Sequence, residues 1–222
     1  MSDRITLETI DADGAVQEAY DDAGGDTRAD LFRKAAVGGG TLIGGGVLLS
    51  GFPALAGAAS SRKSKKNDVK ILNFALTLEY LEAEFYKQAI AGGALSGAPL
   101  ETARIVGAHE DAHVKFLRDA LGRKAVKKPK FDFKDTVTDP AKFLATAVAL
   151  EDTGVAAYAG QVTKVFSAKV LAAAASIHSV EARHASRFRA LAGENFAPRS
   201  FDKANSMKKT LSIVEDTGFI TG

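Results

Sequence analysis

The feature that most constrains this chain is a repeated set of glutamates, tyrosines and histidines, whose two copies lie about 72 residues apart. In each copy a glutamate precedes a tyrosine by seven residues, and a Glu-x-x-His pair follows further along the chain. The first copy consists of Glu79, Tyr86, Glu110 and His113, and the second of Glu151, Tyr158, Glu181 and His184. This repeat predicts two similar structural halves that contribute matching polar residues to one site.

The spacing of apolar residues predicts an all-α chain with four long helices, at about 67–91, 99–121, 140–165 and 168–192. Asn67 or Asp68 is expected to cap the first of these helices. Asp139, which precedes a proline, is expected to begin the third helix, and Ser167 the fourth. A shorter fifth helix is expected at about 202–215.

The lengths of the connections predict how these helices are arranged. The first and second helices are joined by a short connection, as are the third and fourth, so each pair should form an antiparallel hairpin. The second and third helices are separated by residues 123–139. About 17 extended residues reach about 56 Å, whereas a helix of about 24 residues is about 36 Å long. The connection can therefore cross the full length of a four-helix bundle.

The repeated glutamates and histidines fit a site for two metal ions in the core of such a bundle. Residues three apart on a helix share one face, so the members of each Glu-x-x-His pair point in the same direction. An uncompensated buried carboxylate costs roughly 3–5 kcal/mol, and four together repel one another unless cations balance them. Glutamate and histidine ligands suit iron or manganese, and the chain has no cysteine to favour zinc or copper(I). The sequence therefore predicts two iron or two manganese ions, held by Glu79, Glu110, His113, Glu151, Glu181 and His184.

Glu82 competes with Glu79 for the ligand position on the first helix. It lies four residues after the apolar residue Leu78, so it also shares a face with the expected core. We favour Glu79 because Glu151 matches its spacing to the following tyrosine. The position that corresponds to Glu82 in the second half is Gly154, which offers no ligand.

A zinc-peptidase interpretation of one helix has to be weighed against the two-metal site. Residues 109–113 read His-Glu-x-x-His, which is the motif of zinc metalloproteases. No glutamate between 111 and 150 provides the usual third ligand, and the longer form of the motif does not continue after His113. This interpretation also leaves the second Glu-x-x-His pair unexplained, so we favour the two-metal site.

Four further residues are expected just outside the ligands, where they could hydrogen-bond to them: Tyr86, Tyr158, His109 and His178. For the tyrosines, the commoner alternative is packing in the core with a satisfied hydroxyl. For the histidines, the commoner alternative is a place on the helix surface.

The chain before the predicted bundle has the character of an export segment. Residues 1–34 combine an acidic stretch, which we expect to be disordered, with a basic flank. Residues 35–59 carry no charge, are rich in glycine and contain an Ala-x-Ala pattern, which is typical of a cleaved signal. The segment resembles a twin-arginine signal, although Ala29 stands where the second arginine should be. An uncleaved membrane anchor is the alternative, and residues 60–66 form a basic linker.

Residues 70–192 as a whole resemble a ferritin-like di-metal bundle of the exported bacterial type related to desiccation-associated proteins. The stretch Leu-Glu-Tyr-Leu-Glu-Ala-Glu-Phe-Tyr at 78–86 is similar to the first helix of that family. The resemblance implies a four-helix bundle over 67–193, followed by a C-terminal extension over 194–222. It also implies a role for each ligand. Glu79 and Glu151 would be terminal ligands, and Glu110 and Glu181 would bridge the two metals. His113 and His184 would each bind one metal.

The function that the resemblance implies is that of an exported protein of the periplasm or cell envelope that acts in stress protection. Its dinuclear centre would react with dioxygen or hydrogen peroxide, either to oxidise ferrous iron or to remove peroxide. A manganese-catalase-like enzyme and a metal-free structural bundle are the alternatives. We expect a homodimer, no nucleic-acid partner, and association with the membrane or envelope through residues 35–59.

Overall fold

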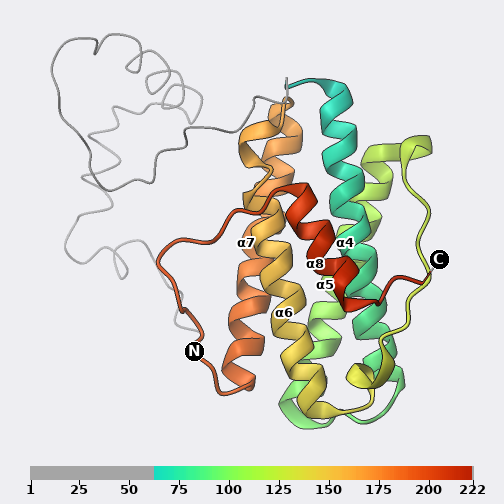
Figure 1. The fold of residues 1–222 in the computed structure, drawn as a ribbon, viewed down its shortest axis with the longest axis vertical. Coiled ribbons are helices and arrows are strands. Elements are labelled where there is room, and N and C mark those ends of the chain that lie inside the picture. The colour runs from blue at the N-terminus through green and yellow to red at the C-terminus, as the bar shows by residue number, and fades with distance from the viewer. Residues whose placement is uncertain (1–62, 222) are drawn as a thin grey trace, which may run out of the picture. The chain divides into compact units, whose positions relative to one another are not determined.

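The computed structural model describes residues 63–221, which form a helical bundle without β-strands (Figure 1). The α-helices are α4 (Lys65–Ala91), α5 (Gly97–Leu121), α6 (Pro140–Ala159), α7 (Ala168–Leu191) and α8 (Met207–Thr217). Short 3-10 turns are η1 (Gly122–Lys124), η2 (Lys134–Val137) and η3 (Val162–Lys164). The expected all-α fold with a short C-terminal helix is therefore confirmed.

The expected export segment, residues 35–59, lies outside the described residues. In the part of the chain that the structure describes, no helix is both long and apolar enough to cross a membrane.

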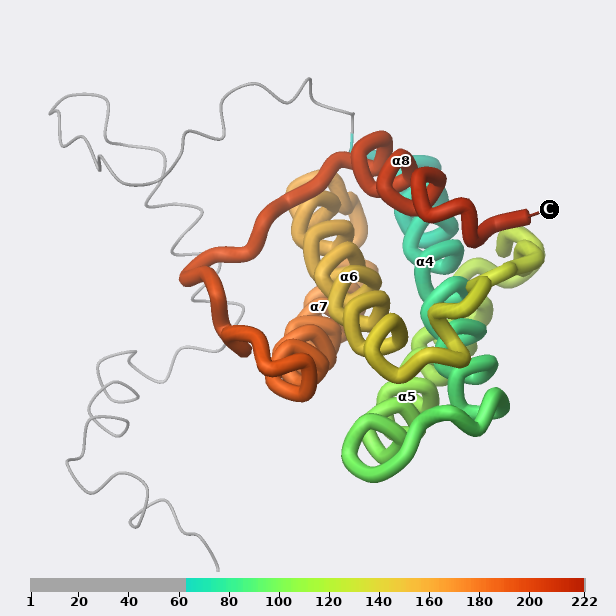
Figure 2. Tube along the Cα trace, turned by 60° about the horizontal axis from the view of Figure 1, so that its bottom comes forward, coloured from blue at the N-terminus to red at the C-terminus, as the bar shows by residue number. Residues whose placement is uncertain are grey.

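The bundle consists of two helical hairpins joined by a long crossover. α4 packs along α5 and α6 along α7, while α4 also contacts α6, and α5 contacts α7, between the hairpins. The crossover, residues 122–139, runs back along the bundle, so that α6 begins at the end where α5 also begins (Figure 1). α8 lies across α4 and α6 on one side of the bundle (Figure 2). The expected topology is confirmed.

The first helix begins two residues earlier than the sequence predicted. The side chain of Ser64 caps α4 by accepting a hydrogen bond from the N–H of Asn67 at 3.1 Å, so the expectation that Asn67 or Asp68 would be the cap is wrong. Asp68 instead accepts hydrogen bonds from the backbone N–H groups of Phe166 and Ser167, at 2.8 and 2.9 Å. Its buried carboxylate therefore ties the start of α4 to the chain that enters α7.

Two further helices differ from their expected bounds near the same end of the bundle (Figure 1). α6 ends at Ala159 instead of continuing to about 165, and the turn η3 follows it. The backbone of Asn205 packs against this end, and its N–H donates to the carbonyl oxygen of Ala156 at 2.8 Å. Because Asn205 is bonded to α6 in this way, α8 begins only at Met207 and not at about 202. The caps Asp139 and Ser167 are confirmed for α6 and α7.

Two apolar clusters fill the bundle on either side of a polar layer. One cluster is rich in aromatic rings: Phe85 stacks on Phe143 at 5.3 Å between centroids, and Tyr86 stacks on Phe188 at 5.5 Å. The other is mainly aliphatic and includes Tyr158. The polar residues between the two clusters are therefore enclosed by apolar side chains on both sides along the bundle.

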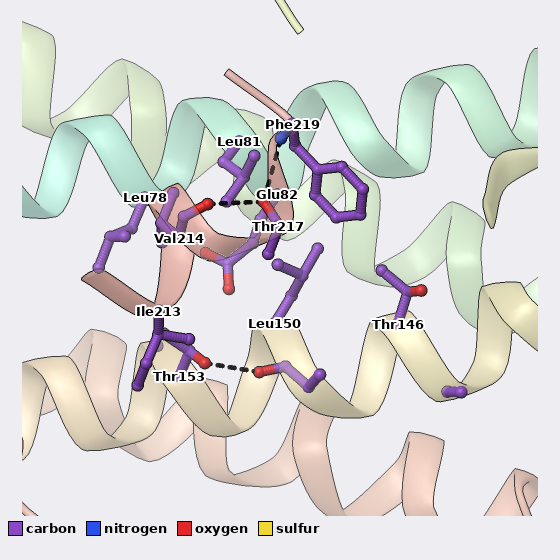
Figure 3. Close-up of a pocket in the computed structure, with 13 residues that line it drawn as sticks. Leu78, Leu81, Glu82, Thr146, Leu150, Thr153, Ile213, Val214, Thr217 and Phe219 are labelled. Atoms are coloured by element: carbon purple, nitrogen blue, oxygen red, sulfur yellow. Dashed lines mark hydrogen bonds between the residues drawn. The ribbon is translucent and has the colours of Figure 1, made fainter. Parts of the chain in front are cut away.

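The C-terminal segment is held onto the bundle by apolar contacts and by backbone hydrogen bonds. Val214 of α8 and the following Phe219 are buried in the aromatic cluster (Figure 3). The N–H of Asp132, in the crossover, donates to the carbonyl oxygen of Phe219 at 2.9 Å. α8 therefore covers one face of the α4 and α6 pair at a fixed position.

Gly160 is expected to tolerate no side chain. A Cβ atom added there would lie 1.7 Å from the backbone oxygen of Asn205, which cannot move aside as the end of a flexible side chain can. We expect Gly160→Ala to lower the free energy of unfolding by about 1–3 kcal/mol, measured by urea denaturation followed by circular dichroism. The matched control is Gly154→Ala in α6, whose new Cβ would approach only side-chain atoms, the nearest two at 3.2 and 3.5 Å, and should cost less. Equal losses in the two variants would contradict this account.

Candidate metal centre

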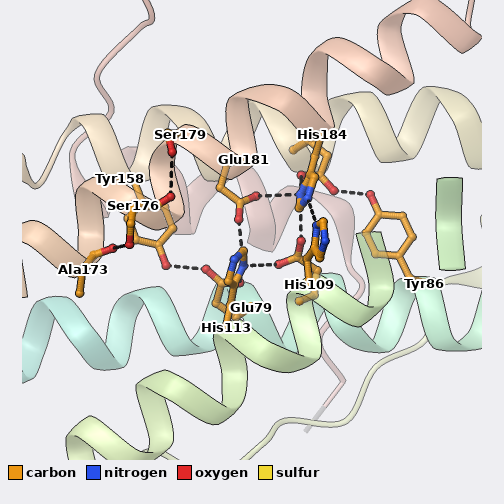
Figure 4. Close-up of polar contacts among 12 residues, drawn as sticks. Glu79, Tyr86, His109, His113, Tyr158, Ala173, Ser176, Ser179, Glu181 and His184 are labelled. Carbon is orange, nitrogen blue, oxygen red and sulfur yellow. Dashed lines mark hydrogen bonds and ion pairs between the residues drawn. The ribbon is translucent and has the colours of Figure 1, made fainter. Parts of the chain in front are cut away.

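The six candidate ligands come from four helices and meet in the middle of the bundle (Figure 4). α4 provides Glu79, α5 provides Glu110 and His113, α6 provides Glu151, and α7 provides Glu181 and His184. All four carboxylates are fully buried, whereas the two imidazoles are slightly exposed. The structure thus brings together every residue of the set that the repeat singled out.

Helical periodicity explains why each Glu-x-x-His pair faces inward. On α5, the buried residues Val106 and Leu117 lie one turn before the glutamate and one turn after the histidine. On α7, Ile177 and Phe188 occupy the same two positions relative to their pair. Burial of these apolar neighbours fixes the rotation of both helices, and the polar pairs are carried into the core with them.

The ligand atoms form two overlapping groups. Within each group, one atom from every residue lies within 4.8 Å of the others, a spacing at which a single metal ion could contact all of them. The groups are Glu79, Glu110, His113 and Glu181, and Glu110, Glu151, Glu181 and His184. Glu110 and Glu181 belong to both groups, which is the geometry in which two carboxylates could bridge two cations.

Several buried polar atoms of this cluster lack hydrogen bonds within the described residues. They are Glu110 Oε1, Glu151 Oε2, both carboxylate oxygens of Glu181, and Nδ1 of His184. Nδ1 of His184 lies only 3.0 Å from Glu110 Oε1, yet this contact lacks hydrogen-bond alignment. Buried polar atoms are rarely left without a partner in native proteins. Their common direction toward the two groups fits the binding of metal ions.

Two tyrosines connect the halves of the cluster reciprocally. The hydroxyl of Tyr86, on α4, donates to Glu151 on α6, and the hydroxyl of Tyr158, on α6, donates to Glu79 on α4. Each half therefore orients the glutamate of the other half. The sequence predicted that the tyrosines lie beside the ligands, but their equal spacing from Glu79 and Glu151 did not indicate that the partners would be exchanged.

The two outer histidines behave differently. Nδ1 of His109 lies 2.9 Å from Nε2 of His184, and the two rings stack with 5.1 Å between centroids. This contact engages the nitrogen of His184 that points away from the carboxylates. Nε2 of His178 is buried without a hydrogen-bond partner in the described part of the chain, and no contact of His178 with a ligand is observed.

Glu82 is buried next to the cluster but belongs to neither group of ligand atoms. Its Oε1 atom lies 3.2 Å from the point where a Cβ on Gly154 would be. Burial raises its pKa well above the usual value, and repulsion from Glu181 and Glu151 raises it further. Of the two glutamates on α4, Glu79 therefore belongs to a candidate ligand group, while Glu82 lies beside Gly154 of α6.

A protein-family model described as a ferritin-like domain matches residues 67–194, more than half of the chain, and includes all six candidate ligands. This chain belongs to the ferritin-like domain family. The match confirms the ferritin-like superfamily that the sequence suggested. A search of curated proteins found no match. Inward-facing glutamates and Glu-x-x-His pairs on four helices are the residues from which ferritin-like bundles build two-metal sites.

Without metal, protonated imidazoles supply the positive charge beside the carboxylates of this ferritin-like bundle. Burial by itself lowers the pKa of His113, but close contacts with the carboxylates of Glu110, Glu181 and Glu79 outweigh it and raise the pKa to about 12. Nδ1 of His113 lies 3.1 to 3.2 Å from these three carboxylates. Burial likewise lowers the pKa of His184, and its glutamate partners raise it to about 11.

The carboxylates divide into one that is strongly acidic and two that resist ionisation. Burial acts to raise the pKa of Glu110, but close contacts with the imidazoles of His113 and His184 outweigh it and lower the pKa to about 2. For Glu79 and Glu151, burial and repulsion between neighbouring carboxylates raise the pKa well above the usual value. Two imidazolium ions therefore offset only part of the negative charge that the site would carry when every glutamate is ionised.

The metal-free protein should lose thermal stability as the pH rises from about 7 to about 10. His113 and His184 have raised pKa values, so their contribution to the free energy of unfolding is complete below the pKa of an unfolded histidine. This contribution is lost as the pH rises toward about 12 for His113 and about 11 for His184. The raised pKa values of Glu79 and Glu151 act in the same direction, because their ionisation is unfavourable in the folded state. The measurement is the melting temperature of chelator-treated protein against pH.

The control for this experiment is His178→Gln, which should leave the trend unchanged because His178 has no observed contact with the ligands. Metal-loaded protein should show a weaker or reversed trend, because metal binding requires deprotonated ligands. A melting temperature of the metal-free protein that rises over this range would contradict the charge distribution described above.

Proposed function

We propose that this protein holds two iron or two manganese ions as a resident dinuclear centre. The observation that carries the proposal is the pair of overlapping ligand groups that share Glu110 and Glu181. Two divalent cations would balance the four carboxylates of these groups, and neutral imidazoles would complete the ligand set. Mixed carboxylate and imidazole ligands are suited to iron and manganese.

The candidate ligands would hold the metals in different ways. Glu110 and Glu181 would bridge the two ions, Glu79 and Glu151 would each bind one, and His113 and His184 would each add a nitrogen. Tyr86 and Tyr158 would fix the terminal glutamates through their hydrogen bonds, so that each carboxylate presents its other oxygen to the site. His109 would hold the ring of His184 through Nε2, so that Nδ1 of His184 points toward the carboxylates.

Such a centre, when loaded, supplies electron transfer to an oxidant such as dioxygen or hydrogen peroxide. The protein contributes a pocket from which bulk water is excluded, since the carboxylates are fully buried. We therefore propose a redox role that consumes one of these oxidants in stress protection. A manganese-catalase-like reaction is the nearest alternative, because it would use nearly the same ligands.

The charge of one groove bears on whether iron is held permanently or is taken up as a substrate. Between α5 and α7, a cavity of about 540 Å³ reaches the edges of His113 and His184. Arg183 and Arg187 line it, against a single acidic residue, Glu101. A groove with this excess of positive charge repels ferrous ions. This supports an oxidant-consuming enzyme more than a ferroxidase that takes up iron along this path.

Metal analysis should find two iron or manganese ions per chain after anaerobic loading. The double variant Glu110→Ala/Glu181→Ala should lose both ions, because both groups share these residues. Metal should also raise the melting temperature of the wild-type protein but not of the variant, since a ligand that binds only the folded state stabilises it. The measurements are elemental mass spectrometry and thermal denaturation.

The matched control is Glu101→Ala/Glu215→Ala, which removes two exposed glutamates and should leave the metal content unchanged. Wild-type protein that binds neither iron nor manganese would overturn the proposal. The remaining interpretation would then be a metal-free structural bundle that protects the cell envelope.

We also propose that the protein is exported, on the basis of the uncharged segment 35–59 and its basic flank. A reporter enzyme that is active only outside the cytoplasm should become active when fused behind residues 1–62. Deletion of 35–59 should abolish that activity, while Arg28→Lys/Arg33→Lys should reduce it if the twin-arginine pathway is used. Full reporter activity without residues 35–59 would rule out this segment as the signal.

A further inference from the structure

An apolar pocket lies on the side of the bundle that α8 covers (Figure 3). It has a volume of about 310 Å³ and is bounded by α4, α6, α8 and Phe219. Its walls are mainly aliphatic, with Leu81, Leu150, Ile213 and Val214 among the lining residues. The pocket is distinct from the groove between α5 and α7, which has arginines in its walls.

The pocket wall carries four polar side chains, Glu82, Thr146, Thr153 and Thr217, and two of these threonines are bonded to their own helices. The hydroxyl of Thr153 donates to the carbonyl oxygen of Ala149 at 2.7 Å, and that of Thr217 donates to the carbonyl oxygen of Val214 at 2.6 Å. Glu82 is the one charged residue in the lining, and it is 3 % exposed. No hydrogen bond of Glu82 to another described residue is observed, so its carboxyl group faces the pocket without a protein partner.

The inner end of the pocket touches the candidate metal centre. Gly154 lines the pocket, and a Cβ atom at this position would lie 3.2 Å from Glu82 Oε1 and 3.5 Å from Glu181 Oε2. Glu181 is one of the two carboxylates that both ligand groups share. The absence of a side chain at Gly154 therefore brings the inner end of the pocket close to both Glu82 and the shared candidate ligand Glu181.

We propose that this pocket is the route by which dioxygen reaches the metal centre, with Glu82 and Gly154 at its inner end. The inference rests on the dinuclear centre proposed above. Dioxygen is small, uncharged and apolar, and apolar cavities accept such molecules in preference to water and ions. The aliphatic walls and the internally bonded Thr153 and Thr217 match this occupant, whereas hydrogen peroxide would find few hydrogen-bond partners there besides Glu82 and Thr146.

The first test uses xenon, which occupies apolar cavities and needs no metal. Crystals of the full chain under xenon pressure should show the atom between Leu150 and Val214. Ala149→Phe, which places a ring at the pocket wall, should abolish this binding. Ala141→Phe is the matched control, because Ala141 is an exposed alanine of the same helix outside the pocket lining. Xenon bound only elsewhere in wild-type protein would overturn the proposal.

The second test measures oxidation of the reduced, metal-loaded protein by stopped-flow absorbance. The rate constant with dioxygen should fall several-fold in Ala149→Phe and stay unchanged in Ala141→Phe. The rate constant with hydrogen peroxide should fall much less. Ile213→Phe blocks the pocket from α8 and replaces Ala149→Phe should that variant fail to fold.

The outcomes separate this inference from the proposed function. If the protein binds two metals and reacts with dioxygen equally fast in both pocket variants, the route is wrong and the centre stands. If both oxidants are slowed equally, the preference for dioxygen is wrong. If the wild-type protein binds no metal, the proposed function fails, and the route is overturned with it even when xenon occupies the pocket.

Discussion

Four glutamate side chains buried side by side are the constraint on which the rest of this structure depends. Moving carboxylates out of water costs several kcal/mol each unless charge and hydrogen bonds compensate them. In the absence of metal, the compensation comes from two imidazoles and two tyrosine hydroxyls, and two of the glutamates still resist ionisation. The cluster persists because aromatic and aliphatic side chains on both sides hold the helices in place.

The chain topology follows from the need to bring two Glu-x-x-His helices together. α5 and α7 belong to different hairpins, and they contact each other only because the long crossover returns the chain to the other end of the bundle. Glu110 and Glu181, which both ligand groups share, are carried on these two helices. Contacts outside the site also hold the two hairpins together, since Asp68 links the start of α4 to the chain that enters α7.

The helices and the six clustered residues could be predicted because they depend on periodicity and on a repeated pattern within the chain. The end of α6 could not, because it is set by the backbone of Asn205, which is distant in sequence. Asp68 looked like a helix cap, yet its partners come from about a hundred residues away. The exchange of tyrosine partners and the isolation of His178 depend on how the hairpins pack, which a single sequence does not encode locally.

The reciprocal tyrosine contacts make each hairpin an incomplete half. In an isolated α4–α5 hairpin, Glu79 would lack the hydroxyl that orients it, and the same is true of Glu151 in α6–α7. A partly folded chain therefore offers no finished ligand set to a passing ion. Under the proposed function, metal capture would follow the docking of the hairpins, and the bound ions would stabilise an assembly that the side chains have already aligned.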